Sequence, residues 1–228
     1  MLFEYEAMIK FDSDIYKVAG ILLVLALVLC SAYYITRLSF LFWIFCVFCS
    51  SFLFAFIFFR DPERKGPIDK HSVVSAADGV IIDVSTVETE GFHDKRALRI
   101  AVFMNVFNVH VNRSPVSGTV LKTVHKPGKK ISAYKKRAEY ENECGDTDIE
   151  TSLGLVRVRQ IAGLVARRVV TRVQSGDVLG RGDRIGIIRF GSRVDVFLPL
   201  TYTAAVAEGD HVRAGESVIA QPANTMRK

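Results

Sequence analysis

The chain reads Ile187-Ile188-Arg189-Phe190-Gly191-Ser192-Arg193-Val194-Asp195-Val196-Phe197-Leu198-Pro199 near its C-terminal end. Apolar residues alternate with polar ones after Ser192, and an apolar run also precedes Gly191, so each flank fits a β-strand with one face in a core. Glycine and serine between two such runs favour a tight corner. The stretch therefore predicts two strands that meet at Gly191 and Ser192.

The chain beyond Pro62 repeats this pattern. Short runs rich in Val and Ile alternate with Asp-Gly, Ser-Gly, Pro-Gly and Gly-Asp turns, which is typical of a β-sandwich or barrel. We expect a mainly β domain with little helix and a long polar connection over residues 126–150. The expected strands are 73–76, 80–87, 97–103, 105–111, 118–124, 154–160, 183–190, 193–198 and 217–220.

Two segments of the β region are similar to each other. Residues 173–183 and 206–216 both carry a Gly-Asp turn that is followed six residues later by a glycine and an acidic residue. This hammerhead pattern resembles lipoyl and biotinyl carrier domains, so a barrel-sandwich topology is expected. The carrier lysine is missing, because neither Met-Lys-Met nor Asp-Lys-Ala occurs at a hairpin tip.

Two apolar segments, residues 18–35 and 39–59, lie near the N-terminus and are separated by Thr36-Arg37-Leu38. Their lengths approach that of a bilayer crossing, so we expect an α-helical membrane hairpin, either two spans or one re-entrant loop. A signal peptide is disfavoured, because charged residues precede the first segment and a second apolar run follows at once. The expected organisation is a polar segment 1–17, the hairpin 18–59 and a β domain 60–228. Basic residues flank the hairpin on both sides, which places both flanks in the cytoplasm.

The excess positive charge lies outside the hairpin region, since residues 1–59 hold three basic and four acidic residues while the whole chain has a net charge of +6. A basic domain tethered to a membrane suits anionic lipid head groups. No zinc-finger, RNA-binding or helix-turn-helix pattern supports nucleic acid as the partner. Three of the four cysteines lie in the apolar segments and the histidines are scattered, so neither a disulfide framework nor a metal site is indicated.

The Gly191-Ser192 pair has the atoms for self-cleavage. Glycine leaves its carbonyl open to attack by the serine hydroxyl, and the ester formed by such an acyl shift can eliminate. Elimination across Ser192 would leave a dehydroalanine that becomes a pyruvoyl group, a covalent cofactor made from the chain itself. Most Gly-Ser pairs are ordinary turns, however, and the dipeptide alone does not decide between these alternatives.

Three residues could carry the proton transfers of this reaction. Asp78, His110 and Ser192 supply the orienting carboxylate, the base and the nucleophile of a serine-protease-like relay. His110 lies in the alternating segment 108–112, which as a strand would place it on a polar face. The alternative interpretations are structural: Asp78-Gly79 is a favoured hairpin turn, and His110 is a surface or structurally bonded histidine.

Two further basic groups stand out. Arg167 and Arg168 follow an apolar stretch and are either a solvated edge or a contact for a lipid phosphate or carboxylate. The loop from Lys126 to Arg137 is basic and is expected to be a solvated lid that attracts anionic membrane.

The chain resembles the phosphatidylserine decarboxylase proenzymes of the short, membrane-associated type. Several blocks carry this resemblance in the right order. They are residues 58–64 (FFRDPER), 77–79 (ADG), 108–113 (NVHVNR), 127–129 (PGK), 160–163 (QIAG), 166–168 (ARR), 182–186 (GDRIG) and 190–193 (FGSR).

The resemblance implies that Ser192 becomes the pyruvoyl group after cleavage at Gly191, which gives a β chain 1–191 and an α chain 192–228. Asp78 and His110 correspond to the processing dyad of the family. The pyruvoyl ketone would form a Schiff base with the amine of phosphatidylserine and release phosphatidylethanolamine at the cytoplasmic face of the cell (inner) membrane. Arg167 and Arg168 are candidate substrate contacts, and the cleaved chains would form a heterodimer, with higher homo-oligomers left open.

The sequence departs from the family in two places. Phe107 stands where longer members have a second histidine, which leaves His110 as the candidate proton donor after decarboxylation. Asn142-Glu143-Cys144 stands where the short type usually has an arginine, which removes one expected lipid contact.

Two competing interpretations remain at this point. One keeps the chemistry and changes the lipid, for example to an ether-linked serine lipid. The other is a membrane-anchored carrier or adaptor with an uncut chain, in which Gly191-Ser192 is an inert turn.

Overall fold

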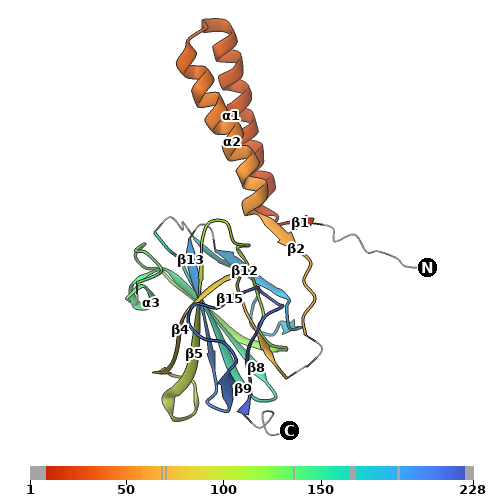
Figure 1. Ribbon diagram of the computed structural model, residues 1–228, viewed down its shortest axis with the longest axis vertical. Helices are drawn as coiled ribbons and strands as arrows, with labels where there is room; N and C mark the ends of the chain where they lie inside the picture. The colour runs from red at the N-terminus through yellow and green to blue at the C-terminus, as the bar shows by residue number, and fades with distance from the viewer. Residues whose placement is uncertain are drawn as a thin grey trace, which may run out of the picture. The chain divides into compact units, whose positions relative to one another are not determined.

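The computed structural model describes residues 9–67, 69, 71–135, 137–164, 168–188 and 191–223. The chain forms two compact units, residues 1–63 and residues 64–228 (Figure 1). The first unit is mainly helical and the second is mainly β. The predicted combination of a β domain and an N-terminal helical pair is thereby confirmed.

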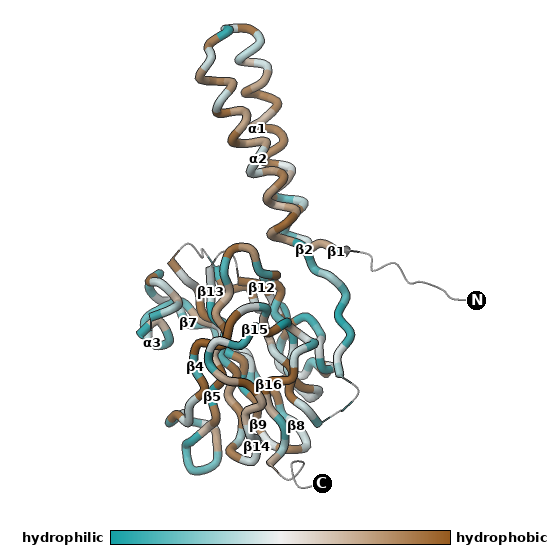
Figure 2. Tube along the Cα trace, in the orientation of Figure 1, coloured by the Kyte–Doolittle hydropathy of each residue, from teal (hydrophilic) through white to brown (hydrophobic). Residues whose placement is uncertain are grey.

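The helical unit is a hairpin of α1 (Asp14–Thr36) and α2 (Ser39–Phe58), closed by a short antiparallel pair of β1 (Ile9–Phe11) and β2 (Arg60–Pro62). The chain reverses at Arg37, which adopts a left-handed φ of 57°. Only 6% of the most apolar 18-residue window of each helix is buried, and Figure 2 shows apolar residues along both helices. Two helices of this length and composition are consistent with membrane association.

An eight-stranded antiparallel sheet organises the β unit and curls into a half-barrel (Figure 1). Its strands in spatial order are β11 (Val178–Leu179), β7 (Gly118–Lys126), β8 (Cys144–Thr151), β9 (Gly154–Ile161), β13 (Ser192–Leu198), β5 (Arg96–Met104), β4 (Gly79–Glu88) and β15 (His211–Val212).

Two small antiparallel sheets complete the β unit. One has the order β10 (Val169–Thr171), β12 (Arg184–Ile188) and β6 (Val111–Arg113). The other has the order β14 (Tyr202–Ala204), β16 (Val218–Pro222) and β3 (Val73–Val74). The described helical elements of this unit are a 3-10 turn, His93–Lys95, and the four-residue α3, Ala138–Glu141.

Strand β13 lies near the middle of the large sheet, between β9 and β5. Its residues alternate as predicted: Val194, Val196 and Leu198 belong to the main hydrophobic core, whereas Arg193 and Asp195 lie on the opposite face, where charged residues gather. Because Ser192 is cross-strand partner to the core residue Met104, it shares the face of the core.

The two similar segments found in the sequence occupy equivalent places. Gly176 and Gly209 both have a φ of 94°, and the following aspartates, Asp177 and Asp210, each accept a hydrogen bond from the amide three residues earlier (2.9 and 2.8 Å). The turns lead into β11 and β15, which pair with β7 and β4 at the two edges of the large sheet. The β unit is therefore built from two pseudo-equivalent halves.

The expectation of a polar connection over 126–150 is wrong in its second half, because Cys144–Thr151 is strand β8 in the large sheet. The polar residues that disguise this strand, Asp146 and Asp148, are buried in ion pairs with Arg159 and Arg157 of β9. Ion pairing across the strands replaces the apolar alternation by which a strand is usually identified.

The expected strand over 105–111 is also wrong. Residues 105–110 form turns, and the regular strand β6 begins only at Val111. The Asn105 side chain accepts a hydrogen bond from the Phe107 amide (2.8 Å), and Asn108 accepts one from the Asn105 amide (2.9 Å). These side-chain bonds to the backbone favour a turn over an extended strand.

Candidate active site

The peptide bond predicted to be cleaved, between Gly191 and Ser192, lies where the polypeptide enters the large sheet. Ser192 is the first residue of β13 and is fully buried, with its Oγ 3.6 Å from Met104 Sδ. Gly191 has a φ of +49°, in the left-handed region that glycine adopts without steric cost. The Gly191 carbonyl thus directly precedes a buried serine at the start of a strand in the large sheet.

Gly163 lies against the carbonyl of Gly191. A Cβ atom added to Gly163 would lie 1.8 Å from the Gly191 carbonyl oxygen and 3.4 Å from Cβ of Ala133. Only glycine at position 163 allows this approach. Sequence reasoning quoted Gly163 within a family block but gave it no role, since no local pattern shows which distant carbonyl a glycine will meet.

A series of hydrogen-bonded polar side chains lies buried beside Ser192. Asn112 Nδ2 is 3.5 Å from the same Met104 sulfur that Ser192 contacts, and Asn112 Oδ1 accepts a hydrogen bond from Gln160 Nε2 (2.7 Å). Gln160 in turn accepts a bond from Thr171 Oγ1 (3.1 Å). Asn112 and Gln160 are fully buried. These amides fix the local packing around the serine, because each polar group has a partner.

His110 is fully buried in the turn before β6, and the strand that was predicted to present it on a polar face does not form at this position. Its Nδ1 lies 2.9 Å from the carbonyl oxygen of Asn108. A neutral imidazole that donates from Nδ1 carries its basic lone pair on Nε2. The Asn108 carbonyl can only accept, so it favours the tautomer in which Nε2 is free to take up a proton.

Asp78 is buried at the start of β4 and accepts two hydrogen bonds in the structure. Oδ2 accepts from Arg64 Nη2 (2.8 Å), and Oδ1 accepts from the amide of Ala214 (2.8 Å). Arg64 also binds Glu216 at 3.1 Å, and its side chain is 9% exposed. A contact between Asp78 and His110 stays a prediction.

The pseudo-equivalent half of the domain explains one of these bonds. Ser117, which precedes Gly118 as Asp78 precedes Gly79, accepts a hydrogen bond from the amide of Arg181 (3.0 Å). The bond from Ala214 to Asp78 is its counterpart. Accepting this amide hydrogen bond is therefore a structural role, which the serine fills in the other half of the domain. The ion pair with Arg64, by contrast, requires the carboxylate of Asp78.

The two arginines predicted to contact substrate follow Gly163. Arg168 is exposed at the start of the segment that leads into β10, and Arg167 lies outside the described residues. Their role stays a prediction.

Charged residues form a network on the face of the sheet opposite Ser192. Arg193 binds Asp195 through two bonds of 2.6 Å, and Arg99 binds Glu139 of α3 and Asp83. Complete burial raises the pKa of Asp195, and Arg193 opposes this shift. Burial also acts to raise the pKa of Asp83, but hydrogen bonds from Ser85 and Arg99 outweigh it and lower the pKa.

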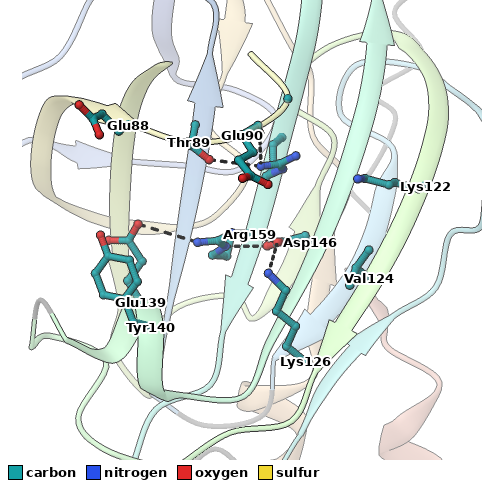
Figure 3. Close-up of a pocket in the computed structure, with 12 residues that line it drawn as sticks. Glu88, Thr89, Glu90, Lys122, Val124, Lys126, Glu139, Tyr140, Asp146 and Arg159 are labelled. Atoms are coloured by element: carbon teal, nitrogen blue, oxygen red, sulfur yellow. Dashed lines mark hydrogen bonds and ion pairs between the residues drawn. The ribbon is translucent and has the colours of Figure 1, made fainter. Parts of the chain in front are cut away.

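This charged face also borders a cavity of about 610 Å³, which Arg157, Arg159, Asp146, Glu139 and Lys126 help to line (Figure 3). The pKa of Asp146 is lowered: burial would raise it, but Arg159 more than compensates. Because β13 alternates, the cavity and the Ser192 side chain lie on opposite faces of the sheet. The network anchors the strand that begins at Ser192 from the face opposite the Ser192 side chain.

Comparison with known proteins identifies the family. A family model described as phosphatidylserine decarboxylase matches residues 52–220. Proteins named phosphatidylserine decarboxylase proenzyme include one from Desulfotalea psychrophila, 44% identical over 77% of this chain and 82% of its own length. Another, from Nitratidesulfovibrio vulgaris, is 49% identical over 72% of this chain and 76% of its own. The chain belongs to the phosphatidylserine decarboxylase family.

Proposed function

We propose that the chain converts phosphatidylserine to phosphatidylethanolamine with a pyruvoyl group that it makes from its own Ser192. Decarboxylation of phosphatidylserine follows from membership of the family, and the relatives are named as proenzymes. The cleavage site, the group formed there and the residue roles are the parts proposed here.

The observation that carries the proposal is the conformation at Gly191 and Ser192. The left-handed φ of Gly191 and the close approach of Gly163 fix the direction of the carbonyl that must be attacked. Ser192 is buried away from water, which protects an ester from hydrolysis before it eliminates. A pyruvoyl group formed from Ser192 would stay attached to the first residue of β13, beside Met104, and would need no separate binding pocket. The residues around Ser192 therefore fit a pyruvoyl group.

The cleavage is proposed to begin with His110 taking the proton of Ser192 Oγ. The oxygen then attacks the Gly191 carbonyl carbon, the bond from that carbon to the Ser192 nitrogen breaks, and the nitrogen takes a proton. Loss of the Cα proton expels the Gly191 carboxylate and leaves a dehydroalanine at position 192. Tautomerisation and hydrolysis, which consume one water and release ammonia, complete the pyruvoyl group.

The two products would stay together after cleavage. The new α chain 192–228 begins with β13, which pairs with β5 on one side and β9 on the other, both from the β chain 1–191. Buried ion contacts from Arg193 to Glu139 add a further link between the two chains. The proposed heterodimer is therefore held by the sheet itself.

When present, the pyruvoyl carbonyl supplies the electrophile that engages the substrate amine and accepts the electrons released with carbon dioxide. The chain's own residues would bind and orient the lipid. Arg167 and Arg168 are proposed to contact its phosphate or carboxylate, and His110 is proposed to return a proton to the product. We further propose that the enzyme works at the cytoplasmic face of the cell inner membrane, from the basic residues that flank the hairpin.

Intact-mass analysis of the full chain in detergent tests the proposal. The expected result is a fragment of residues 192–228 with a pyruvoyl terminus, which gains a covalent lipid adduct when borohydride is added with phosphatidylserine. Ser192→Ala should give one uncut, inactive chain. An active Ser192→Ala protein, or an active wild-type chain that stays whole, would refute the pyruvoyl mechanism.

A further inference from the structure

Three exposed apolar side chains lie on loops around the cleavage site: Phe107, Tyr134 and Leu164, which we call the apolar rim. They are 67%, 66% and 68% exposed. A single exposed apolar residue is ordinary on a protein surface. Three of them on neighbouring loops at one site indicate that this surface contacts another one.

The structure places all three close to Ser192. Leu164 directly follows Gly163, at which an added Cβ would collide with the Gly191 carbonyl oxygen. Tyr134 directly follows Ala133, whose Cβ would lie 3.4 Å from the same added Gly163 Cβ. Its ring packs edge-on against Phe103 at 5.7 Å, on the face of the sheet opposite the Ser192 side chain. Phe107 lies in the turn that follows Met104, the cross-strand partner of Ser192. The three loops that carry the rim thus lie near the end of β13 where the reactive group would form.

Basic residues accompany the rim. Lys129, Lys130, Lys135 and Arg137 are exposed on the loop that carries Tyr134, and Arg168 is exposed after Leu164. The sequence has no acidic residue between Lys126 and Ala138. Exposed apolar residues flanked by lysine and arginine are suited to the boundary between anionic head groups and acyl chains.

We propose that the apolar rim inserts into an anionic lipid bilayer, so that the catalytic end of the β unit docks on the membrane from which it takes its substrate. This inference rests on the proposed function, since a lipid must leave the bilayer by a path that ends at Ser192. The rim shortens that path, because the head group has to reach the buried Ser192 while the acyl chains stay out of water.

Tryptophan placed on the rim of the full-length chain measures the insertion. The natural chain has one tryptophan, Trp43 in α2, so a Trp43→Phe background leaves the introduced residue as the only reporter. Leu164→Trp and Tyr134→Trp test the rim. Leu153→Trp is the matched control, because Leu153 is also exposed (40%) but lies in the β8–β9 turn. The next residue, Gly154, faces Pro199 beyond the other end of β13.

The three variants are reconstituted in bilayers with brominated acyl chains and phosphatidylglycerol, which is anionic but has no serine amine. The expected result is at least about twofold stronger quenching at positions 164 and 134 than at 153, reduced when neutral lipid replaces phosphatidylglycerol or when salt is raised. Equal quenching at all three positions would overturn the proposal. Rim quenching that ignores lipid charge would overturn its electrostatic part.

Kinetics separates docking from chemistry. The double variant Leu164→Ser with Tyr134→Ser should lose roughly three- to tenfold in kcat/KM on bilayer phosphatidylserine, the range expected when apolar side chains leave the interface. The double variant should cleave itself normally and should keep its rate on a short-chain phosphatidylserine that is monomeric in water. The control variant Leu153→Ser should cleave itself normally and keep its rate on both the monomeric and the bilayer substrate. Equal loss on monomeric and bilayer substrate would overturn docking, whereas an absence of cleavage and activity in the unmodified chain would refute the proposed function.

Discussion

Replacing Gly163 by alanine should block maturation of the chain. The added Cβ would lie 1.8 Å from the Gly191 carbonyl oxygen, whereas real Cβ contacts essentially never fall below 3.0 Å. The carbonyl must therefore move by more than 1 Å relative to the Gly163 backbone. Gly163 does not have a positive φ that would exclude alanine, so the effect comes from the lost space alone.

The expected magnitude follows from the geometry of attack. The hydroxyl of Ser192 must approach the carbonyl carbon along a narrow direction, and a misplacement of about 1 Å costs on the order of 100-fold in rate. Cell-free synthesis of the full chain in the presence of lipid nanodiscs, followed by intact-mass analysis over time, gives the rate at which the 192–228 fragment appears.

Two control variants separate a displaced carbonyl from a weakened fold. Gly118→Ala places a Cβ 2.2 Å from the carbonyl oxygen of Glu150, a comparable clash between β7 and β8. It should lower the melting temperature but leave the cleavage rate of folded protein nearly unchanged. Gly180→Ala, whose nearest atom would be the Asp183 carboxylate at 3.2 Å, should affect neither. The reasoning is refuted if Gly163→Ala matures at the wild-type rate, or if Gly118→Ala slows cleavage as much.

Three further changes test other contacts of the β unit. Asp78→Ser should keep the bond from the Ala214 amide and fold normally but accumulate precursor, seen on denaturing gels; normal maturation would remove the carboxylate from its proposed role. Arg64→Ala should slow cleavage by about tenfold, because a charge-assisted bond that orients Asp78 is lost; Arg64→Lys should restore part of the rate, and a wild-type rate in Arg64→Ala would contradict this positioning. Since the pKa of Asp146 is lowered, its ion pair with Arg159 stabilises the fold above the unfolded pKa near 3.8 and is lost as the pH falls. Asp146→Asn should therefore cost about 3 kcal/mol at neutral pH and make stability less dependent on pH below 4, as measured by urea unfolding at several pH values; an unchanged acid profile would show that the pair does not contribute.

The sequence by itself determined the elements whose pattern is local. The length of the apolar runs predicted the helical hairpin, because crossing a bilayer requires a minimum number of residues. The alternation in β13 predicted which of its side chains face the core. The repeated Gly-Asp turns showed that residues 173–183 and 206–216 are similar, since a left-handed φ strongly favours glycine at the same place in both. The Gly191-Ser192 pair was also identified from the sequence, and its cleavage remains a prediction.

The tertiary structure alone decided the contacts between segments far apart in the chain. Strand β8 was missed because its aspartates are stable in a sheet only beside the arginines of β9. The pairing of Arg64 with Asp78 and the approach of Gly163 to Gly191 could not be predicted either, because neither residue type indicates its partner. Local conformational preference acts over a few residues, whereas the direction of the Gly191 carbonyl and the burial of His110 depend on which strands the whole fold brings together.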